Sequence, residues 1–369
     1  MPALAKAKEG EVEFWAESQS GKSKAEAEVF YNPRMQFSRD LSVAALKAFR
    51  PESVIDAMSA TGIRGLRYAK EVDSIKEAVL NDYSTKAYLL IKKNIRLAKA
   101  KNARAENKDA NVLLSSERAD AVDLDPFGTP APYMDSAARC ADRLIMATAT
   151  DTAVLCGVYP KVCLRTYGST VFKTEYCHET SVRILAAHIA KAFALHDKAI
   201  TPIISQSTDH YIRVFARVEK GSRKADKALE NLGYIIHCKS CGHRRISKKA
   251  GKEEHQCGLC GAETRIFGPV WSEKIEDKEF VKATLKEAEG MVRPEKLLRQ
   301  LEAEADAEPL YYDMHHICSS LKLTPPKTEK ILEAIKAQGY TAVRTHMREQ
   351  GLKTSCDIKN LKKILAGIA

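Results

Sequence analysis

Residues 53–65 read SVIDAMSATGIRG, a short apolar run followed by a loop with two glycines. Glycine lets the backbone turn tightly and approach a ligand, and the start of the next helix favours an anion or a carboxylate. The next predicted strand ends in Asn81-Asp82, and an acid at about this distance hydrogen-bonds ribose hydroxyls in nucleotide-binding α/β folds. Together they predict a nucleoside ligand, whereas Asp82 alone is equally compatible with a helix cap. The loop lacks the full G-x-G-x-x-G pattern and a Walker lysine, which disfavours NAD and ATP.

Strand-like and helix-like runs alternate around this loop, from about residue 29 to 218, which is typical of an α/β sheet. Apolar periodicity predicts strands at 53–58, 78–80, 121–124, 144–148, 200–205 and 211–217, and helices at 83–98 and 179–195. A basic stretch, Lys220–Lys224, then breaks the pattern. We therefore predict two domains, 1–220 with an N-terminal extension at 1–28, and 221–369.

A second motif, Asp125-Pro126-Phe127-Gly128, ends the predicted strand at 121–124. Pro126 stiffens the chain, so that the Asp125 carboxylate points off the carboxyl edge of the sheet, where α/β ligands bind. Phe127 offers a flat face on which a base can stack. A carboxylate beside an aromatic ring suits an exocyclic amine, a poor nucleophile that must be held and relieved of a proton. The alternative is that Asp125-Pro126 only starts a loop and Phe127 fills the core.

Four of the ten cysteines form two C-x2-C pairs separated by 15 residues. This spacing predicts a structural four-thiolate zinc site at Cys238, Cys241, Cys257 and Cys260, in a ribbon over 236–262. The alternative is a pair of reduced thiol hairpins. The remaining cysteines show no metal-ligand spacing and are expected to be buried small residues; they are Cys140, Cys156, Cys163, Cys177, Cys318 and Cys356.

The chain is basic, with 59 Lys+Arg against 48 Asp+Glu and a net charge of +11 over 369 residues. This balance suggests a polyanionic partner. The run Lys239–Lys252 carries six Lys/Arg and no acid, which indicates either a phosphate contact surface or ordinary solvated surface. No apolar run reaches the roughly 18 residues of a membrane helix, and the first ten residues do not resemble a signal peptide. We expect a cytoplasmic protein with reduced cysteines, no membrane association and no obligate protein partner.

These motifs resemble the tRNA (guanine-26-N2)-dimethyltransferase family. The matching blocks are Asn32-Pro33-Arg34-Met35, 59–65, Asn81-Asp82, 123–130, 147–151, 155–157, Cys177-His178-Glu179, 268–271 and 344–346. The resemblance implies a Rossmann-like, S-adenosylmethionine-dependent methyltransferase domain over 1–220. It also implies a smaller α+β domain over 221–369 that carries the zinc ribbon and binds tRNA.

The resemblance further implies a cofactor site for S-adenosylmethionine. Arg39 would meet the methionine carboxylate, a pairing that guanidinium geometry favours. Arg64 would act from the glycine loop, Asp82 would bind the ribose, and Asp109-Ala110 would lie beside the adenine.

For the chemistry, the resemblance implies that Asp125 is the catalytic carboxylate and that Phe30 and Phe127 stack on the target guanine. The expected reaction transfers methyl groups to the N2 amine of guanine 26 in tRNA, giving N2-methyl- and N2,N2-dimethylguanosine. Two alternatives stay open: methylation of another nucleic-acid amine, such as rRNA guanine or DNA adenine, and an inactive zinc-ribbon RNA-binding protein.

Overall fold

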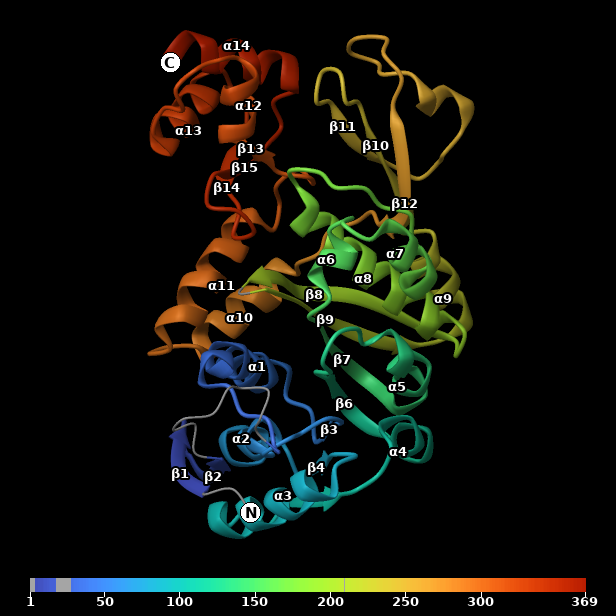
Figure 1. The fold of residues 1–369 in the computed structure, drawn as a ribbon, viewed down its shortest axis with the longest axis vertical. Coiled ribbons are helices and arrows are strands. Elements are labelled where there is room, and N and C mark those ends of the chain that lie inside the picture. Colours follow the sequence, from blue (N-terminus) through green and yellow to red (C-terminus); the bar gives the residue numbers. More distant parts are fainter. Residues whose placement is uncertain (1–3, 18–27, 209) are drawn as a thin grey trace. The chain divides into compact units, whose positions relative to one another are not determined.

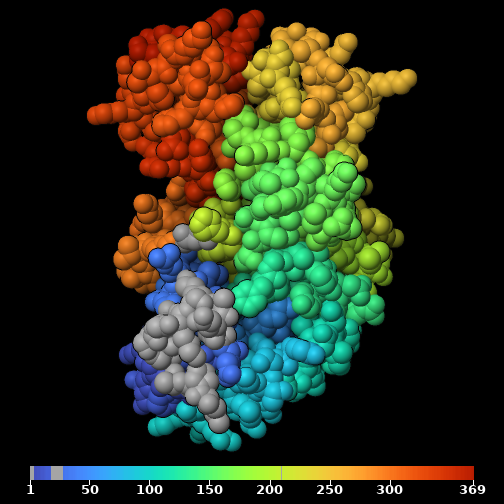
Figure 2. Space-filling model, in the orientation of Figure 1, coloured from blue at the N-terminus to red at the C-terminus, as the bar shows by residue number. Residues whose placement is uncertain are grey.

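The computed structural model describes residues 4–17, 28–208 and 210–369 (Figure 2, with the other residues in grey). The predicted N-terminal extension at 1–28 therefore lies partly outside the described residues. Contacts divide the chain into two compact units: unit 1 is 1–148, 215–220 and 282–298, and unit 2 is 149–214, 221–281 and 299–369. Both units are discontinuous in sequence, so they do not test a boundary at a single position. The boundary at 220/221, between a catalytic and a tRNA-binding domain, stays a prediction.

Unit 1 is built on five parallel strands in the order β5-β4-β3-β6-β7 (Figure 1). Their bounds are β3 (Ser53–Asp56), β4 (Glu77–Asn81), β5 (Ala103–Glu106), β6 (Ala119–Leu124) and β7 (Ala141–Ala149). The register places Asp56 beside Leu80 of β4 and Asp123 of β6. Since parallel strands end at the same edge, the residues that follow β4, β5 and β6 gather at one edge of the sheet. The α/β fold and the strands predicted at 53–58, 78–80, 121–124 and 144–148 are confirmed.

Helices and a hairpin surround this sheet. The helices are α1 (Gln36–Phe49), α2 (Ile63–Glu71), α3 (Thr85–Ala98), α4 (Ala110–Ser116) and α5 (Met134–Cys140), and the hairpin is β1 (Leu4–Glu9) with β2 (Val12–Glu17). Buried Asn94 of α3 ties the hairpin to the glycine loop, because it exchanges hydrogen bonds with the Trp15 backbone (2.7 and 3.0 Å) and donates to the Thr61 carbonyl (2.8 Å). Helix α3 begins later than predicted, since Ser84 caps it by accepting from the Ala87 N–H.

The first part of unit 2 centres on the long helix α8 (Cys177–Ala194). It packs against strand β8 (Lys198–Thr208) and helix α9 (Ser222–Leu229), and α6 (Thr152–Leu155) and α7 (Pro160–Tyr167) precede it. Strand β9 (Tyr211–Lys220) lies half in each unit. These elements agree with the strands predicted at 200–205 and 211–217 and with the helix predicted at 179–195.

The rest of unit 2 contains two small antiparallel sheets. The first has the order β11-β10-β12 and comprises β10 (Leu232–His237), β11 (Arg244–Ser247) and β12 (Arg265–Trp271). The second has the order β13-β15-β14 and comprises β13 (Tyr312–Asp313), β14 (Ala342–Arg344) and β15 (Gly351–Thr354). Helices α12 (Met314–Ser320), α13 (Thr328–Ala337) and α14 (Ile358–Ile368) share a buried core with the second sheet. The predicted α+β character of this region is confirmed.

Two further helices, α10 (Lys278–Glu287) and α11 (Val292–Glu304), each have residues in both units. Short 3-10 turns occur at Pro33–Met35, Ala131–Tyr133 and Lys252–His255. Among the described residues, none of the helices has the length and apolarity needed to traverse a bilayer.

Candidate active site and zinc centre

The glycine loop between β3 and α2 is held in place by two carboxylates of unit 1. Asp56 Oδ2 accepts from the Gly65 N–H (3.0 Å), and Asp82 Oδ2 accepts from the Ala60 N–H (2.8 Å). Gly62 has a φ of +81°, and a side chain at Gly65 would meet Leu80 at 2.6 Å. Both positions therefore require glycine, because the loop turns sharply and lies directly against β4.

Two of the predicted cofactor-binding acids, Asp82 and Asp109, also accept hydrogen bonds from backbone N–H groups at the carboxyl edge of the sheet. The other oxygen of half-buried Asp82 accepts from the Ser84 N–H (2.9 Å). Asp109 caps α4, since its Oδ1 accepts from the N–H groups of Asn111 and Val112. Asp109 is exposed and its Oδ2 has no partner in the described part of the chain, while the adjacent Ala110 is buried. The ribose role of Asp82 and the adenine role of Asp109-Ala110 stay predictions.

Arg39, on α1, is almost wholly buried and is held by the N-terminal hairpin. Its Nε and Nη2 donate to the two carboxylate oxygens of buried Glu9 (2.7 and 2.5 Å), and Nη2 also donates to the Asn32 carbonyl (3.1 Å). Tyr31 donates to the same Glu9 carboxylate (2.8 Å), and its pKa is raised by burial and by Glu9. Only Nη1 of Arg39 is without a hydrogen bond to the described residues. The guanidinium is therefore fixed on one side and retains two N–H donors on the other.

The predicted catalytic acid, Asp125, is bound by Arg64. Arg64 Nη2 donates to Asp125 Oδ2, and its Nη1 donates to Ser42 (3.3 Å) and lies 3.6 Å from Asp123 Oδ2. Burial lowers the pKa of Arg64, but Asp125 and Asp123 outweigh it and raise the pKa well above its usual value. Tyr68, one turn further along α2, donates to Asp123 Oδ2 (2.5 Å). Asp125 Oδ1 keeps no partner among the described residues, so this oxygen is available to a ligand.

The structure brings Phe30 and Phe127 together. Their ring centroids lie 4.9 Å apart with the planes at 85°, which is an edge-to-face contact. Phe127 is 78% exposed, so the alternative that it fills the core is excluded. The two rings do not form parallel walls, and the exposed surface of Phe127 is free to receive a flat base; their role in stacking on guanine stays a prediction.

Sequence reasoning missed several residues of this region, among them Glu9, Asp56 and Tyr68. Burial and the neighbouring Asp123 carboxylate raise the pKa of Asp56 to about 7. Tyr68 could have been found from its spacing, because residues four apart on a helix share a face and Tyr68 follows Arg64 by four residues. Nothing local indicates Glu9, which lies 30 residues before Arg39.

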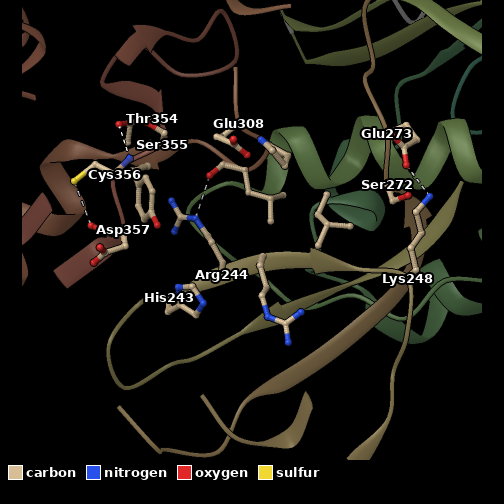
Figure 3. A pocket seen from close by; sticks show the side chains of 15 residues that line it. His243, Arg244, Lys248, Ser272, Glu273, Glu308, Thr354, Ser355, Cys356 and Asp357 are labelled. Atoms are coloured by element: carbon tan, nitrogen blue, oxygen red, sulfur yellow. Dashed lines mark hydrogen bonds and ion pairs between the residues drawn. The ribbon is translucent and has the colours of Figure 1, made fainter. Parts of the chain in front are cut away.

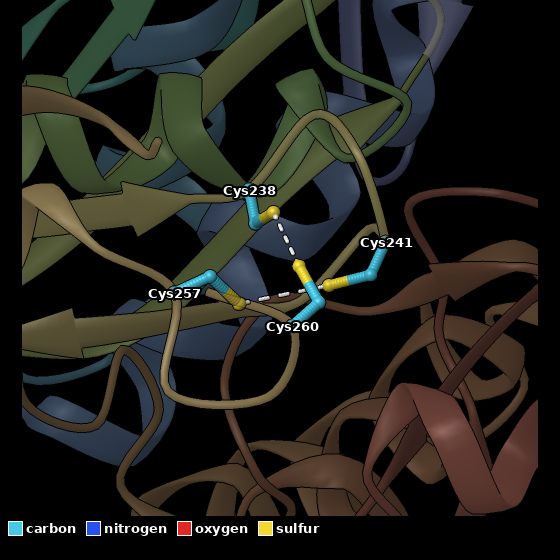
Figure 4. Close-up of side chains that lie close together, drawn as sticks. All are labelled: Cys238, Cys241, Cys257 and Cys260. Carbon is cyan, nitrogen blue, oxygen red and sulfur yellow. Dashed lines mark hydrogen bonds between the residues drawn. The ribbon is translucent and has the colours of Figure 1, made fainter. Parts of the chain in front are cut away.

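The four cysteines of the predicted ribbon converge in unit 2 (Figure 4). Cys238 Sγ lies 3.5 Å from Cys260 Sγ, Cys241 Sγ lies 3.6 Å from Cys257 Sγ, and all four sulfurs are within 4.8 Å of one another. A tetrahedral four-thiolate zinc ion with bonds of about 2.3 Å spaces its sulfurs about 3.8 Å apart. The donor set therefore fits a structural zinc ion, which would use all four sulfurs and have no open coordination position.

The backbone of the two cysteine turns explains this convergence. In each turn the N–H of the first cysteine donates to the carbonyl five residues later, His243 for Cys238 and Ala262 for Cys257 (both 2.8 Å). The glycine four residues after each of these cysteines, Gly242 or Gly261, returns a hydrogen bond and has a positive φ. The two turns thus have the same geometry, and each directs both of its thiols to one point.

Acids pair with three of the six cations in the basic run of the ribbon, Arg244, Arg245 and Lys248. Arg244 is buried and binds Glu175 and the Leu310 and Tyr311 carbonyls, and Lys248 pairs with Glu273 (2.7 Å). Both cations line a pocket of about 450 Å³ (Figure 3). Since these cations already have partners, the pocket is a poor phosphate site. Within this run, the exposed lysines Lys239, Lys249 and Lys252 have no ion pair to the described residues, and they are the better candidates for phosphate contact.

Comparison with known proteins places these features in a family. A model of the family described as N2,N2-dimethylguanosine tRNA methyltransferase matches residues 10–366. The tRNA (guanine(26)-N(2))-dimethyltransferase of Methanosphaera stadtmanae is 41% identical over 362 residues, covering 94% of this chain and 93% of its own length. The enzyme of that name from Pyrococcus horikoshii is 39% identical over 364 residues, covering 91% and 93%.

A solved structure gives the same result. The complex of Trm1 from Pyrococcus horikoshii with S-adenosyl-L-methionine has a TM-score of 0.88 and 35% identity, and the match covers 98% of this chain and 100% of that one. The fold is thus that of an α/β methyltransferase, with its acids at the carboxyl edge of a parallel sheet. The chain belongs to the N2,N2-dimethylguanosine tRNA methyltransferase family, which confirms the resemblance of its motifs.

Proposed function

We infer that this chain is an S-adenosylmethionine-dependent tRNA (guanine-26-N2)-dimethyltransferase. The observation that carries this inference is the carboxyl edge of the sheet in unit 1, where Asp125 is fixed by Arg64 and keeps one oxygen open. The curated relatives that cover nearly the whole chain are named for this reaction.

The residues at this edge suit the parts of S-adenosylmethionine. The two Nη1 donors of Arg39 match a carboxylate, the tight loop at Gly62 and Gly65 allows close backbone approach, and the Asp82 and Asp109 carboxylates match ribose hydroxyls and an adenine amine. When bound, the cofactor supplies an electrophilic methyl group. We propose that Arg39, Arg64, Asp82, Asp109 and Ala110 make up its binding site.

Asp125 acts on the amine of the substrate. The lone pair of the guanine N2 amine is delocalised into the ring, so an acceptor for its N–H both orients the nitrogen and withdraws a proton as the new bond forms. Oδ1 serves as that acceptor, while Arg64 holds Oδ2 and prevents the carboxylate from rotating away. Fixing the amine in line with the methyl group should account for much of the rate acceleration.

The guanine is held by Phe127, with Phe30 supporting it edge-on. Because the exposed face of Phe127 is not covered by Phe30, it can stack on a base that has left its helix. A flat contact of this kind tolerates a first methyl group on N2, which permits a second transfer and the dimethyl product.

The partner is tRNA, bound mainly by residues 221–369. The net charge of +11 supports a nucleic-acid partner, because phosphate contacts supply most of the affinity for nucleic acids, and the unpaired lysines Lys239, Lys249 and Lys252 provide candidate contacts within 221–369. A tRNA substrate and a zinc site of reduced thiols both suit the cytoplasm, which is where we expect the enzyme to act.

Replacing Asp125 tests the proposal. With Asp125→Asn, which keeps the size of the side chain but removes its charge, kcat for tRNA methylation should fall roughly 10²–10⁴-fold. The affinity for S-adenosylmethionine, measured by calorimetry, should stay close to that of the wild type. Asp135→Asn, at an exposed helix position, is the matched control and should methylate normally.

Two results would contradict the proposal. Turnover close to the wild-type rate in Asp125→Asn would remove Asp125 from the chemistry. Mapping the methylated nucleoside in tRNA, rRNA and DNA incubated with the enzyme should give N2-methylguanosines at position 26 of tRNA; methylation of rRNA or DNA alone would show that the substrate is a different one.

A further inference from the structure

A second group of metal-ligand side chains lies in unit 2 and uses none of the ribbon cysteines. The two thiol sulfurs of Cys156 and Cys177 and one imidazole nitrogen of His178 are all within 4.8 Å of one another. Cys156 follows the last turn of α6, and Cys177 and His178 are the first two residues of α8. Because 20 residues separate the two cysteines, no C-x2-C spacing indicates the group, and only the fold brings it together.

The distances suit a tetrahedral ion of the zinc type. With Zn–S bonds of about 2.3 Å and Zn–N bonds of about 2.0 Å, ligand atoms lie roughly 3.5–3.8 Å apart. The three atoms here need to approach by at most about 1.3 Å to reach that spacing. Two thiolates and an imidazole are also ligands that zinc and other borderline metals prefer over magnesium or calcium.

The surroundings orient the ligands as those of metal sites do. His178 Nδ1 lies 3.2 Å from the Ser207 hydroxyl of β8. In the tautomer in which Nδ1–H donates to this hydroxyl, the ring is fixed and Nε2 has the lone pair that a metal would take. Cys156 Sγ lies 3.2 Å from the hydroxyl of buried Ser181, which in turn donates to the Cys177 carbonyl (2.7 Å). The group is therefore held by a shell of hydroxyls contributed by α8 and β8.

We propose that Cys156, Cys177 and His178 bind a second Zn²⁺ ion through three protein ligands. The site differs from the ribbon, whose four thiolates occupy every position, because its fourth position is open to water or to an external ligand. The open position and the mixed donor set make this zinc more readily exchanged than the ribbon zinc.

Zinc counting on the full-length enzyme tests the proposal. After loading with excess Zn²⁺ and removal of unbound metal, elemental analysis should find two zinc ions per wild-type chain. Cys156→Ser and His178→Ala should each retain one. Cys163→Ala, which removes a buried thiol that belongs to neither group, is the control and should retain two.

Cobalt spectroscopy separates the two sites even if a variant is less stable. The cobalt–thiolate charge-transfer band of the wild type would arise from six Co–S bonds, four in the ribbon and two in the second site. It should therefore fall by roughly one third in Cys156→Ser, with the ribbon signal intact. Ser207→Ala, which changes only the partner of the imidazole, should weaken binding at the second site by roughly 10–100-fold.

Three results would overturn the proposal. The first is a wild-type enzyme that saturates at one zinc ion, all of it held by the ribbon. The second is a Cys156→Ser variant that retains two zinc ions. The third is a zinc-loaded wild-type chain in which Cys156 and Cys177 form a disulfide, seen as the loss of two hydrogens in the intact mass.

Discussion

Both units bury charged side chains, but they do so in different ways. In unit 1, Arg39 binds buried Glu9, and Asp125 binds buried Arg64. Nη1 of Arg39 and Oδ1 of Asp125 each have no partner in the described residues. In unit 2, Glu179 of α8 is enclosed: it accepts from the Arg183 guanidinium and from two backbone N–H groups.

The enclosed cluster of unit 2 extends from Glu179 to Glu304. Lys353 of β15 lies 3.9 Å from Glu179 Oε2 and 3.3 Å from Glu304 Oε2, and His346 contacts the other oxygen of Glu304 (2.5 Å). These residues come from α8, the end of α11, strand β15 and the turn that precedes it, so the cluster connects distant segments of unit 2. The charged groups of unit 1 that keep an unused donor or acceptor, Arg39 and Asp125, can bind a ligand. The charged groups of unit 2 that protein atoms surround stabilise the fold instead.

The largest expected effect comes from removing the central cation of the enclosed cluster. Lys353→Met leaves Glu179 and Glu304 buried without their shared partner, so the free energy of unfolding should fall by about 3–5 kcal/mol. Urea denaturation at neutral pH measures it. Lys274→Met, which removes an exposed lysine paired with Asp306, is the control and should change stability little. If the two substitutions lowered the free energy of unfolding equally, the buried cluster would contribute no more to stability than an exposed ion pair does.

The second effect concerns the open site of unit 1. Arg64→Lys keeps a positive charge but cannot reproduce the fork that reaches Asp125 and Ser42 together. Losing a charge-assisted hydrogen bond of about 1.5–3 kcal/mol should lower kcat roughly 10–100-fold. Single-turnover methylation with saturating cofactor measures this. A change confined to KM for S-adenosylmethionine would instead mean that Arg64 acts only in cofactor binding.

The third prediction concerns how the stability of the enclosed cluster depends on pH through the buried carboxyl group of Glu276. Burial, opposed by Lys353 and reinforced by Glu304, raises the pKa of Glu276 to about 8, against about 4.3 in the unfolded chain. The raised value means that wild-type stability is fully present below about pH 4.3 and is lost as the pH rises towards 8, because only the unfolded chain ionises freely in that window. Glu276→Gln should therefore be several kcal/mol more stable than the wild type at pH 8, since the loss is roughly 1.4 kcal/mol for each pH unit between the two pKa values, and equal to it at pH 4. Denaturation at the two pH values tests this, and a gain of the same size at both would refute the titration.

The sequence predicts those features of the site that depend on local chain geometry. Asp125 and Phe127 lie two residues apart directly after a strand, and each pair of zinc ligands lies in one tight turn, so spacing alone places them. Strands β3, β4 and β6 follow from short apolar runs. By contrast, Glu9 meets Arg39 only because the hairpin folds back onto the sheet, and Cys156 meets Cys177 only because α6 ends beside the start of α8. Contacts of this kind depend on tertiary packing, which residue spacing does not encode.

The smallest expected effect tests whether Glu9 prepares Arg39 for a ligand. Glu9→Gln keeps the side-chain shape and can still accept from Arg39 through its amide oxygen, but it loses the charge and the second acceptor. The guanidinium then becomes free to turn, so KM for S-adenosylmethionine should rise roughly three- to tenfold, as expected for the loss of about 0.7–1.4 kcal/mol, while kcat at saturation stays near the wild-type value. Glu13→Gln, an exposed position on the same hairpin, is the matched control. If Glu9→Gln lowered the melting temperature and left KM unchanged, the Glu9–Arg39 pair would be structural, as the cluster of unit 2 is, and the open donors of Arg39 would have no part in binding the cofactor.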